Sequence, residues 1–545
     1  MKRREFLLNG ALGGAALTGL VDRSENATLP TSETRTDRAV ADFELEEATI
    51  ADLQRAMAQG KRTSRSITEQ YLERIGALDH RGPALHHLIE TNPDALSIAD
   101  QMDRERRSRG PRSALHGIPV LLKDNIDTAD RMTTTAGSLA LEGSIPLRDS
   151  FVAQRLRAAG AVLLGKTNLS EWANFRSTHS TSGWSGRGGQ GKNPYALDRN
   201  PCGSSSGSGG AVSANYTAVA IGTETDGSIV CPSAANGIVG IKPTLGLVSR
   251  AGIIPIAHTQ DTAGPMARTV ADAAIVLTLL TGVDPRDRET ERSRSNLGTD
   301  YTRFLDVNGL RGARIGVPRT KFFGYSDAAD RVTEEAIATM SRLGAKIVDP
   351  ANIPTAGKFD DSEFEVLLYE FKTDLNAYLA GLRAGTRVKT LADIIRFNDE
   401  NKAREMPFFG QEIMKQAQEK GPLTSAKYKA ALAKNRRLSR TEGIDLVMKR
   451  YSLDAIMAPT GSPAWPTDLV NGDHFTGASS TPAAVAGYPN INVPAGFAYG
   501  LPVGISFFGA PFSEAKLIRI AYAFEQATKH RKPPRFASRA EMPPT

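Results

Sequence analysis

Residues 201–232 read PCGSSSGSGGAVSANYTAVAIGTETDGSIVCP and contain two serine-bearing turns separated by small apolar residues. A glycine and serine run such as 203–210 is typical of a flexible linker when it stands alone. Here it leads into residues 212–221, whose small apolar side chains favour a packed helix followed by a strand. Linkers do not usually feed buried segments, so the stretch predicts two turns inside a folded α/β core.

A further segment, GIPVLLKDN at residues 117–125, ends an apolar strand with one lysine, Lys123. A buried lysine is costly to keep charged, so it tends to lose its proton and to become a base near neutral pH. A serine hydroxyl is a poor nucleophile until such a base acts on it. The alternative is a lysine that reaches from a strand end to solvent. Together with the serine turns, this segment predicts a Ser-Ser-Lys hydrolase site.

Other blocks extend the pattern: LLGKTNLSEWANF at 163–175, QDTAGPMARTVAD at 260–272, and GYPNINVPAG at 487–496 followed by GLPVG at 500–504. With these blocks in this order, the chain resembles the amidase signature family, and within it the bacterial peptide amidases. The resemblance runs from about Phe43 to the C-terminal region.

The resemblance implies an α/β fold with a large mixed central β-sheet sandwiched by helices, in one domain spanning residues 43–545. Residues 49–57 and 67–78 have helical periodicity, and Thr63, Ser64 and Ser66 are available to cap the second helix. In relatives, an insertion corresponding to 357–444 helps to wall the substrate entrance. The alternative for this charged, aromatic-containing segment is a solvated helical layer that uses its aromatic residues as ordinary core.

The family pattern makes Ser228 the acyl-forming nucleophile, Ser204 the bridging serine and Lys123 the terminal base. Ser204 and Ser228 are 24 residues apart, the usual separation in the family. The resemblance also implies a cis peptide bond between Gly203 and Ser204.

The turn before the nucleophile is predicted to supply the oxyanion hole from the backbone of Thr225, Asp226, Gly227 and Ser228. Asp226 stands where many members of the family have glycine. Aspartate tolerates a positive φ better than most residues, so we expect the turn to be kept.

Two other motifs are rejected on physical grounds. Residues 160–167 match the phosphate-binding pattern GxxxxGK[ST], but Ala161 to Leu164 are apolar and favour a strand rather than a phosphate loop. Residues 203–207 match the GxSxG elbow of α/β-hydrolases, which would make Ser205 the nucleophile. That elbow needs a preceding strand, and residues 193–201 are turn-rich.

The N-terminus predicts export. Lys2, Arg3 and Arg4 precede a weakly hydrophobic stretch, which resembles a twin-arginine signal peptide over residues 1–27. Residues 28–42 are polar and are expected to form a flexible spacer. We therefore expect a periplasmic or secreted protein with the twin-arginine export machinery as a transient partner. The apolar run is too short for a stable membrane anchor.

The composition of the chain argues against several classes of ligand. The net charge is +7, and no basic stripe with stacking aromatics indicates nucleic-acid binding. The 8 histidines and 2 cysteines show no metal-binding spacing, so neither a metal nor a cofactor is expected, and His258, His474 and His530 are predicted to be dispensable for catalysis. Cys202 and Cys231 are interpreted as small buried apolar side chains, with a disulfide as the alternative.

These features predict an exported amide hydrolase that deamidates C-terminal peptide amides or similar small, neutral amides. The alternatives are a general aliphatic or aryl amidase of the same family and a non-catalytic binding protein on the same scaffold. Many relatives carry an arginine two or three residues after the nucleophile, where this chain has Val230 and Cys231. We therefore expect weak binding of carboxylate substrates, unless Arg187 or Arg250 supplies a cation from elsewhere in the fold.

Overall fold

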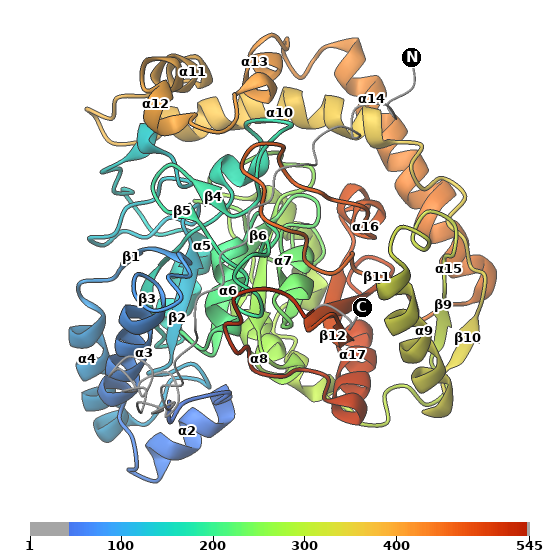
Figure 1. The fold of residues 1–545 in the computed structure, drawn as a ribbon, viewed down its shortest axis with the longest axis horizontal. Coiled ribbons are helices and arrows are strands. Elements are labelled where there is room, and N and C mark those ends of the chain that lie inside the picture. Colours follow the sequence, from blue (N-terminus) through green and yellow to red (C-terminus); the bar gives the residue numbers. More distant parts are fainter. Residues whose placement is uncertain (1–42, 542–545) are drawn as a thin grey trace, which may run out of the picture.

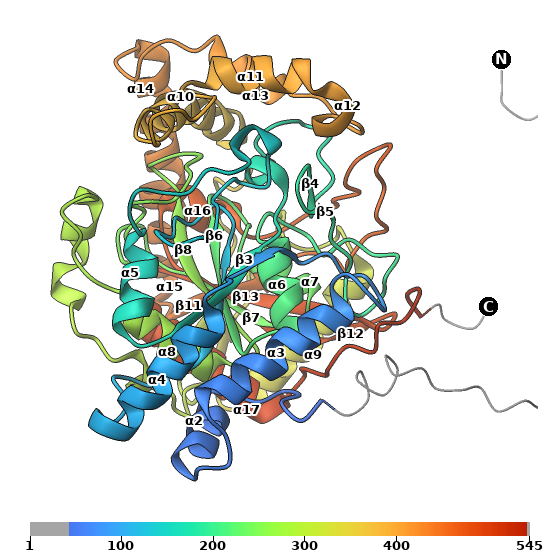
Figure 2. The same cartoon turned by 90° about the vertical axis from the view of Figure 1, so that its left-hand side faces the viewer.

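The computed structural model describes residues 43–541, shown in Figures 1 and 2. The predicted signal peptide (1–27) and spacer (28–42) lie outside the described residues. Eleven strands form one sheet in the order β1-β3-β2-β6-β8-β7-β12-β13-β11-β9-β10, and β4 pairs with β5 separately. The large sheet mixes parallel pairs, such as β2 with β6, and antiparallel pairs, such as β6 with β8. It confirms the expected mixed α/β sheet.

The strands are β1 Leu88–Thr91, β2 Pro119–Lys123, β3 Val162–Thr167, β4 Trp184–Ser185, β5 Gly189–Gln190, β6 Val219–Glu224, β7 Val239–Lys242, β8 Thr262–Ala267, β9 Arg314–Gly316, β10 Lys346–Val348, β11 Ala455–Pro459, β12 Asn490–Ala498 and β13 Leu501–Phe508.

The α-helices are α2 Ile50–Ala58, α3 Ser64–Leu78, α4 Ala95–Arg109, α5 Phe151–Ala158, α6 Ser206–Ser213, α7 Val230–Ala235, α8 Val270–Leu280, α9 Asp327–Arg342, α10 Asp360–Ala380, α11 Leu391–Glu400, α12 Lys402–Glu405, α13 Glu412–Gln418, α14 Ala426–Arg436, α15 Asp445–Tyr451, α16 Thr481–Ala486 and α17 Glu514–Thr528. None of the helices in the described residues is long and apolar enough to cross a membrane.

The central strands β2 and β6 are buried along their whole length. Figure 2 shows α5 and α8 on one side of the strands and α6 and α7 on the other, which explains why these strands are continuously apolar rather than alternating until their carboxyl ends, where Lys123, Thr223 and Glu224 stand. Since β2 and β6 run parallel, with Leu122 beside Ile221, their carboxyl ends meet at one edge of the sheet. Lys123 and the turn that follows β6 are therefore brought together.

The second N-terminal helix begins at a predicted cap, Thr63, whereas the first begins after Thr49, which the periodicity places inside the helix. Thr49 and Thr63 each accept a hydrogen bond from the backbone N–H three residues on, and each forms a capping box, with Asp52 and Ser66 respectively. The second helix starts at Ser64, three residues earlier than its apolar periodicity alone indicated. Capping side chains, rather than apolar spacing, thus define where these helices begin.

The GxxxxGK[ST] match is not a phosphate loop. Its last six residues form strand β3 (Val162–Thr167), and the Lys166 Nζ atom donates hydrogen bonds to the Ile126 carbonyl oxygen (2.7 Å) and to Thr134 Oγ1 (2.8 Å). Lys166 is fully buried. The Lys166 amine therefore joins β3 to the segment that contains Ile126 and Thr134, inside the core.

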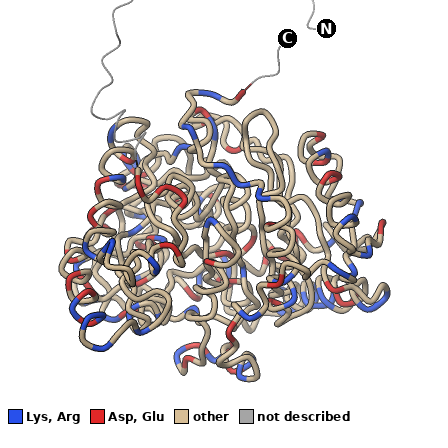
Figure 3. Tube along the Cα trace, turned by 90° about the horizontal axis from the view of Figure 1, so that it is seen from below, with Lys and Arg blue, Asp and Glu red and all other residues tan. Residues whose placement is uncertain are grey.

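Helices α10–α14 lie across one end of the molecule, at the top of Figure 1. Phe371 of α10 is fully buried and contacts Phe175, which follows β3, with ring centroids 4.9 Å apart. Phe408 is 44% exposed, so not every aromatic residue of this segment belongs to the core. The layer packs on the rest of the molecule through an apolar cluster that it shares with residues 136–141, 172–175 and 254–257, so some of its aromatic residues serve as ordinary core. Basic and acidic residues are interspersed along the chain in Figure 3.

Candidate active site

Lys123 ends β2 and is fully buried. Its Nζ atom lies 2.8 Å from Ser204 Oγ, 2.9 Å from Thr223 Oγ1 and 3.3 Å from the Thr223 carbonyl oxygen. A neutral amine has two N–H donors and one lone pair. The two Thr223 oxygens can accept both N–H groups, which leaves the lone pair facing the Ser204 hydroxyl. The contacts therefore suit an uncharged lysine that accepts a proton from Ser204.

The electrostatics favour the same state. Burial lowers the pKa of Lys123 to about 7, because the charged ammonium has lost its water, while the nearby carboxyl groups of Asp261 and Glu224 oppose this shift. The residue is consequently poised to exchange a proton near neutral pH.

The two candidate serines lie on adjacent turns. Ser204 precedes α6, and Ser228 lies in the turn between β6 and α7. The Ser205 N–H donates to the Ser228 carbonyl oxygen (3.1 Å), which ties the turns together, and the Gly203–Ser204 peptide bond is cis, as the family resemblance implies. Within the described residues, Ser228 Oγ has no hydrogen-bond partner, and the residue is 8% exposed.

The turn before α7 presents unused backbone donors. In the described part of the chain, the N–H groups of the predicted donors Thr225, Asp226, Gly227 and Ser228 have no acceptor. Gly227 has a φ of 79°, whereas Asp226 does not adopt a positive φ, so only the glycine uses the left-handed conformation. Four consecutive free N–H groups, the last that of the candidate nucleophile itself, suit a developing oxyanion.

Asp226 serves the turn through its side chain instead. Its carboxylate accepts hydrogen bonds from Ser480 Oγ (2.5 Å) and Thr481 Oγ1 (2.7 Å), which lie at the start of α16. The expectation that Asp226 itself would need left-handed tolerance is therefore wrong: the carboxylate anchors the turn to a distant helix.

Cys202 and Cys231 form a disulfide, so the interpretation of these residues as two separate apolar side chains is wrong. Their Cα atoms are 6.0 Å apart, within the range that a disulfide spans, because the turn before α6 lies against the turn before α7, where the Ser205 N–H donates to the Ser228 carbonyl oxygen. The bridge joins the segment carrying Ser204 to the segment carrying Ser228. Closing a loop over a separation of 29 residues stabilises the fold by about 3–4 kcal/mol on the chain-entropy account.

Ser205 is not available as a nucleophile. Its Oγ donates to the Thr223 carbonyl oxygen (3.0 Å) and accepts from the Thr223 N–H (3.1 Å). The hydroxyl thus fastens the Ser204 turn to the end of β6, which excludes the α/β-hydrolase elbow.

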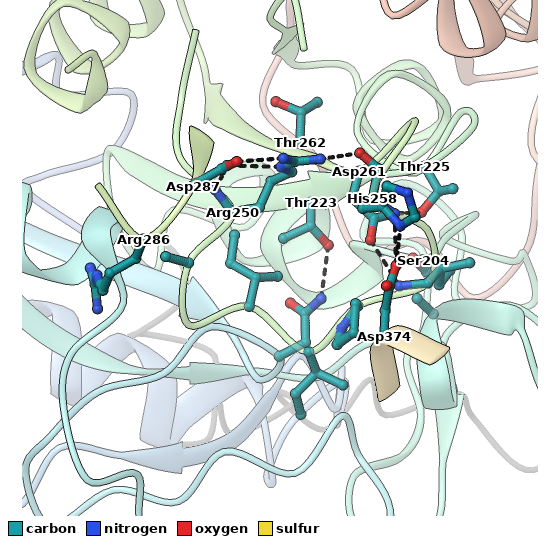
Figure 4. Close-up of a pocket in the computed structure, with 17 residues that line it drawn as sticks. Ser204, Thr223, Thr225, Arg250, His258, Asp261, Thr262, Arg286, Asp287 and Asp374 are labelled. Carbon is teal, nitrogen blue, oxygen red and sulfur yellow. Dashed lines mark hydrogen bonds and ion pairs between the residues drawn. The ribbon is translucent and has the colours of Figure 1, made fainter. Parts of the chain in front are cut away.

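A cavity of about 190 Å³ opens beside Ser204 (Figure 4). Its lining is polar near the serine, apolar along one wall and charged at the rim. The polar residues include Asn125, Ser204, Thr223, Thr225, Asp261 and Thr262; the wall is formed by Ala173, Ala251, Ile253, Ile254, Pro255 and Ile256; the charged rim is formed by Arg250, His258, Arg286, Asp287 and Asp374. Ser228 is not one of the lining residues.

The cations of the rim are paired. Arg250 Nε donates to Asp287 Oδ2 (2.8 Å), and Figure 4 shows the two side chains pointing toward one another. Arg286 Nε lies 3.2 Å from Asp284 Oδ1. Arg187, the other arginine considered from the sequence, donates to Thr133 Oγ1 (2.8 Å) and does not line the cavity.

Of the three histidines considered from the sequence, His258 lines this cavity. Its Nδ1 is 2.8 Å from Asp374 Oδ2 and its Nε2 is 3.5 Å from Glu370 Oε1, and it contacts neither candidate serine by a hydrogen bond. His258, Glu370 and Asp374 could converge on a metal ion, since their ligand atoms lie within 4.8 Å of one another. However, Glu370 already accepts hydrogen bonds from Thr259 and Tyr428, so the group ties α10 to the cavity wall.

Sequence reasoning missed Asp261, although it lies in a block that carried the resemblance. Its carboxylate accepts hydrogen bonds from Thr225 Oγ1 (2.6 Å) and from the N–H groups of Ile256 (2.8 Å) and Ala257 (2.9 Å). Burial raises the pKa of Asp261 to about 6. Asp261 therefore fixes Thr225, the first residue of the candidate oxyanion turn, relative to Ile256 in the apolar wall of the cavity. This role becomes visible only in the fold.

Comparison with known proteins agrees with this geometry. A family model described as Amidase matches residues 66–518. A probable amidase of Arabidopsis thaliana is 46% identical over 508 residues, covering 92% of this chain and 93% of the plant protein. Native peptide amidase from Stenotrophomonas maltophilia has 51% sequence identity and a TM-score of 0.87, and the match covers 91% of this chain and 100% of that chain. An amidase family protein from Bacillus anthracis has 37% sequence identity and a TM-score of 0.82, with 91% of this chain and 94% of that chain covered.

The chain therefore belongs to the amidase family. It is a hydrolase that acts on the carbon–nitrogen bonds of amides, and it is related to peptide amidase.

Proposed function

We propose that the protein hydrolyses neutral amides, C-terminal peptide amides in particular, through an acyl-enzyme on Ser228. The observation that carries this proposal is the buried Lys123 amine, 2.8 Å from Ser204 Oγ and with a pKa lowered to about 7. An amine of this kind is a base at neutral pH. We assign Ser204 as the relay to Ser228, because the hydrogen bond from the Ser205 N–H to the Ser228 carbonyl oxygen (3.1 Å) holds the two serine turns against each other.

The steps follow from these positions. Lys123 takes the proton of Ser204, Ser204 takes the proton of Ser228, and Ser228 Oγ attacks the amide carbonyl carbon. The free N–H groups of the turn from Thr225 to Ser228 stabilise the oxyanion. As the carbon–nitrogen bond breaks, Ser204 gives its proton to the leaving nitrogen and is reprotonated by Lys123, releasing ammonia. Water then attacks the acyl-enzyme by the same relay and yields the free acid.

Two features support neutral amides as substrates: the pairing of the arginines at the cavity and the similarity of the chain to peptide amidase. The arginines nearest the cavity are paired with Asp287 and Asp284, and Val230 and Cys231 follow the nucleophile, so no free cation among the described lining residues is ready for a buried substrate carboxylate. The similarity to peptide amidase points to peptide amides among neutral amides. Asp374 lines the cavity, which supports α10 as part of the substrate entrance.

The first prediction concerns the nucleophile. Ser228→Ala should abolish ammonia release and prevent covalent labelling by a serine-directed phosphonylating probe, because only Ser228 is expected to form the acyl-enzyme. Ser205→Ala is the matched control and should still be labelled. Intact-mass measurement gives the result. Labelling of the Ser228→Ala variant would show that Ser228 is not the nucleophile. A wild-type protein that is neither labelled nor active would favour a non-catalytic binding protein on the same scaffold.

The second prediction concerns pH. The neutral form of Lys123 is the active one, so kcat/KM should fall as the pH drops through about 7 and the amine takes up a proton. Lys123→Ala should lower kcat by about 10²- to 10⁴-fold, the usual contribution of a general base. His258→Gln should keep the acid limb where it is. Displacement of that limb in the histidine variant would contradict lysine as the base.

The third prediction compares malonamide with malonamate, which differ by one carboxylate. Malonamide should have a kcat/KM about 10- to 100-fold higher, since burying an unpaired charge costs that much binding. A peptide amide should be deamidated while the peptide bonds of its free-acid form stay intact. Equal rates for the malonic pair would show that this account of the pocket is wrong, and faster turnover of simple aryl amides than of peptide amides would favour a general amidase.

We also propose that the protein is exported by the twin-arginine route and works in the periplasm or outside the cell. Two observations support this: the basic start with Arg3 and Arg4, which lies outside the described residues, and the Cys202–Cys231 disulfide, a bond that persists mainly in oxidising compartments.

Replacing Arg3 and Arg4 with lysine should keep the protein in the cytoplasm of a bacterial host, where both cysteines should remain open to thiol alkylation. The unaltered protein should be found in the periplasmic fraction with its cysteines protected. Fractionation followed by alkylation and mass measurement tests both points together. Unchanged periplasmic activity in the lysine variant would argue for another route.

A further inference from the structure

A second cavity, of about 300 Å³, lies next to the active-site cavity. The two cavities share Arg250, His258 and Asp287, which form the partition between them. The other walls come from α14, the π-helical turn Arg437–Ile444 and the segment that follows Asp287. The lining residues that matter for charge are Arg288, Glu289, Arg292, Arg436 and Arg440.

This second cavity has an excess of positive charge. Five arginines and two carboxylates line it. Arg250 pairs with Asp287, and Arg292 pairs with Glu289. In the described part of the chain, no carboxylate lies within ion-pairing distance of the remaining Arg288, Arg436 and Arg440.

Arg440 is the most confined of the three unpaired cations. Its Nε donates to the Ala486 carbonyl oxygen (2.8 Å), and its guanidinium lies 5.9 Å from the centre of the Tyr488 ring. Burial and the neighbouring charges of Arg292 and Arg436 lower the pKa of Arg440, although Tyr488 and Asp445 oppose this. Arg288 and Arg436 are exposed, so solvent screens part of their repulsion with Arg440, and an anion placed among the three would compensate the rest.

A buried side chain on the same wall adds a second observation. Asn435 is 2% exposed, and its Nδ2 donates to the Ser362 carbonyl oxygen (3.3 Å), but its Oδ1 has no hydrogen-bond partner in the described part of the chain. A buried acceptor without a donor is costly. A ligand with anionic oxygens and one O–H or N–H donor would satisfy both the arginines and this amide.

We propose that this cavity is a binding site for an oxyanion, a carboxylate or a phosphate, with Arg436 and Arg440 as its direct ligands. Guanidinium groups bind such anions through paired N–H donors. The site also contacts the active site: Gln260 lines it and donates to the Thr225 carbonyl oxygen (3.3 Å) at the candidate oxyanion turn. The binding step does not depend on the proposed function, whereas an effect on turnover does.

The test uses the full chain and inorganic phosphate, with binding measured by calorimetry at low ionic strength. Arg436→Gln and Arg440→Gln should each weaken phosphate binding about 10-fold or more, as expected for a charge-assisted pair. Arg437→Gln is the matched control, because Arg437 is adjacent in sequence, pairs with Glu442 and does not line the cavity. Ser228→Ala should bind phosphate like the unaltered protein, which separates this site from the catalytic proposal.

Kinetics then identify the source of the anion. If the glutamine variants raise KM for a peptide amide with an acidic side chain but not for its neutral counterpart, the substrate itself supplies the oxyanion. If neither KM changes while phosphate binding is lost, a free anion is the ligand. Absence of phosphate binding to the unaltered protein, or equal binding by Arg436→Gln, Arg440→Gln and Arg437→Gln, would overturn the proposal.

Discussion

The chemistry of the site depends on the burial of one amine, that of Lys123, away from water. Lys123 has a pKa of about 7 in the folded protein and about 10.4 in an unfolded chain. Between these values the unfolded chain binds a proton that the folded chain does not, so stability rises with pH across this window and is reduced below it. Packing of the buried central strands against the helices on both sides of the sheet must offset this loss of folding free energy. In return, the buried Lys123 is a base at neutral pH.

Two turns are built around this amine, and each is held from several directions. The Ser204 turn is fastened by Ser205 to the end of β6 and by the disulfide to the start of α7. The oxyanion turn is fastened by Asp226 to α16 and by Thr225 to Asp261. None of these four attachments uses Ser228, whose hydroxyl is left free to react. The arrangement fixes the backbone donors while leaving the candidate nucleophile uncommitted.

Much of this could be predicted from the sequence because the relevant signals are local. An apolar strand ending in Lys123, and glycine and serine turns beside small apolar runs, reveal burial and chemistry within a few residues. The pairing of Cys202 with Cys231, the anchoring role of Asp226 and the position of Asp261 could not be derived in that way. Each depends on segments that are distant in sequence and meet only in the fold. Cys202 precedes α6 whereas Cys231 lies in α7, Asp261 precedes β8, the antiparallel neighbour of β6, and α16 returns to the site late in the chain. The arginine-lined cavity is hidden for the same reason, since Arg288 and Arg440 are far apart in sequence.

The most direct measurement is the titration of Lys123 itself. In protein labelled with ¹³C and ¹⁵N lysine, the Lys123 signal can be identified by its loss in Lys123→Met and followed by NMR from acid to alkaline pH. The account predicts a midpoint near pH 7, which would make the amine a neutral base under working conditions. A signal that stays in the charged form up to about pH 10, as for an exposed lysine, would contradict the proton relay on which the proposed mechanism rests.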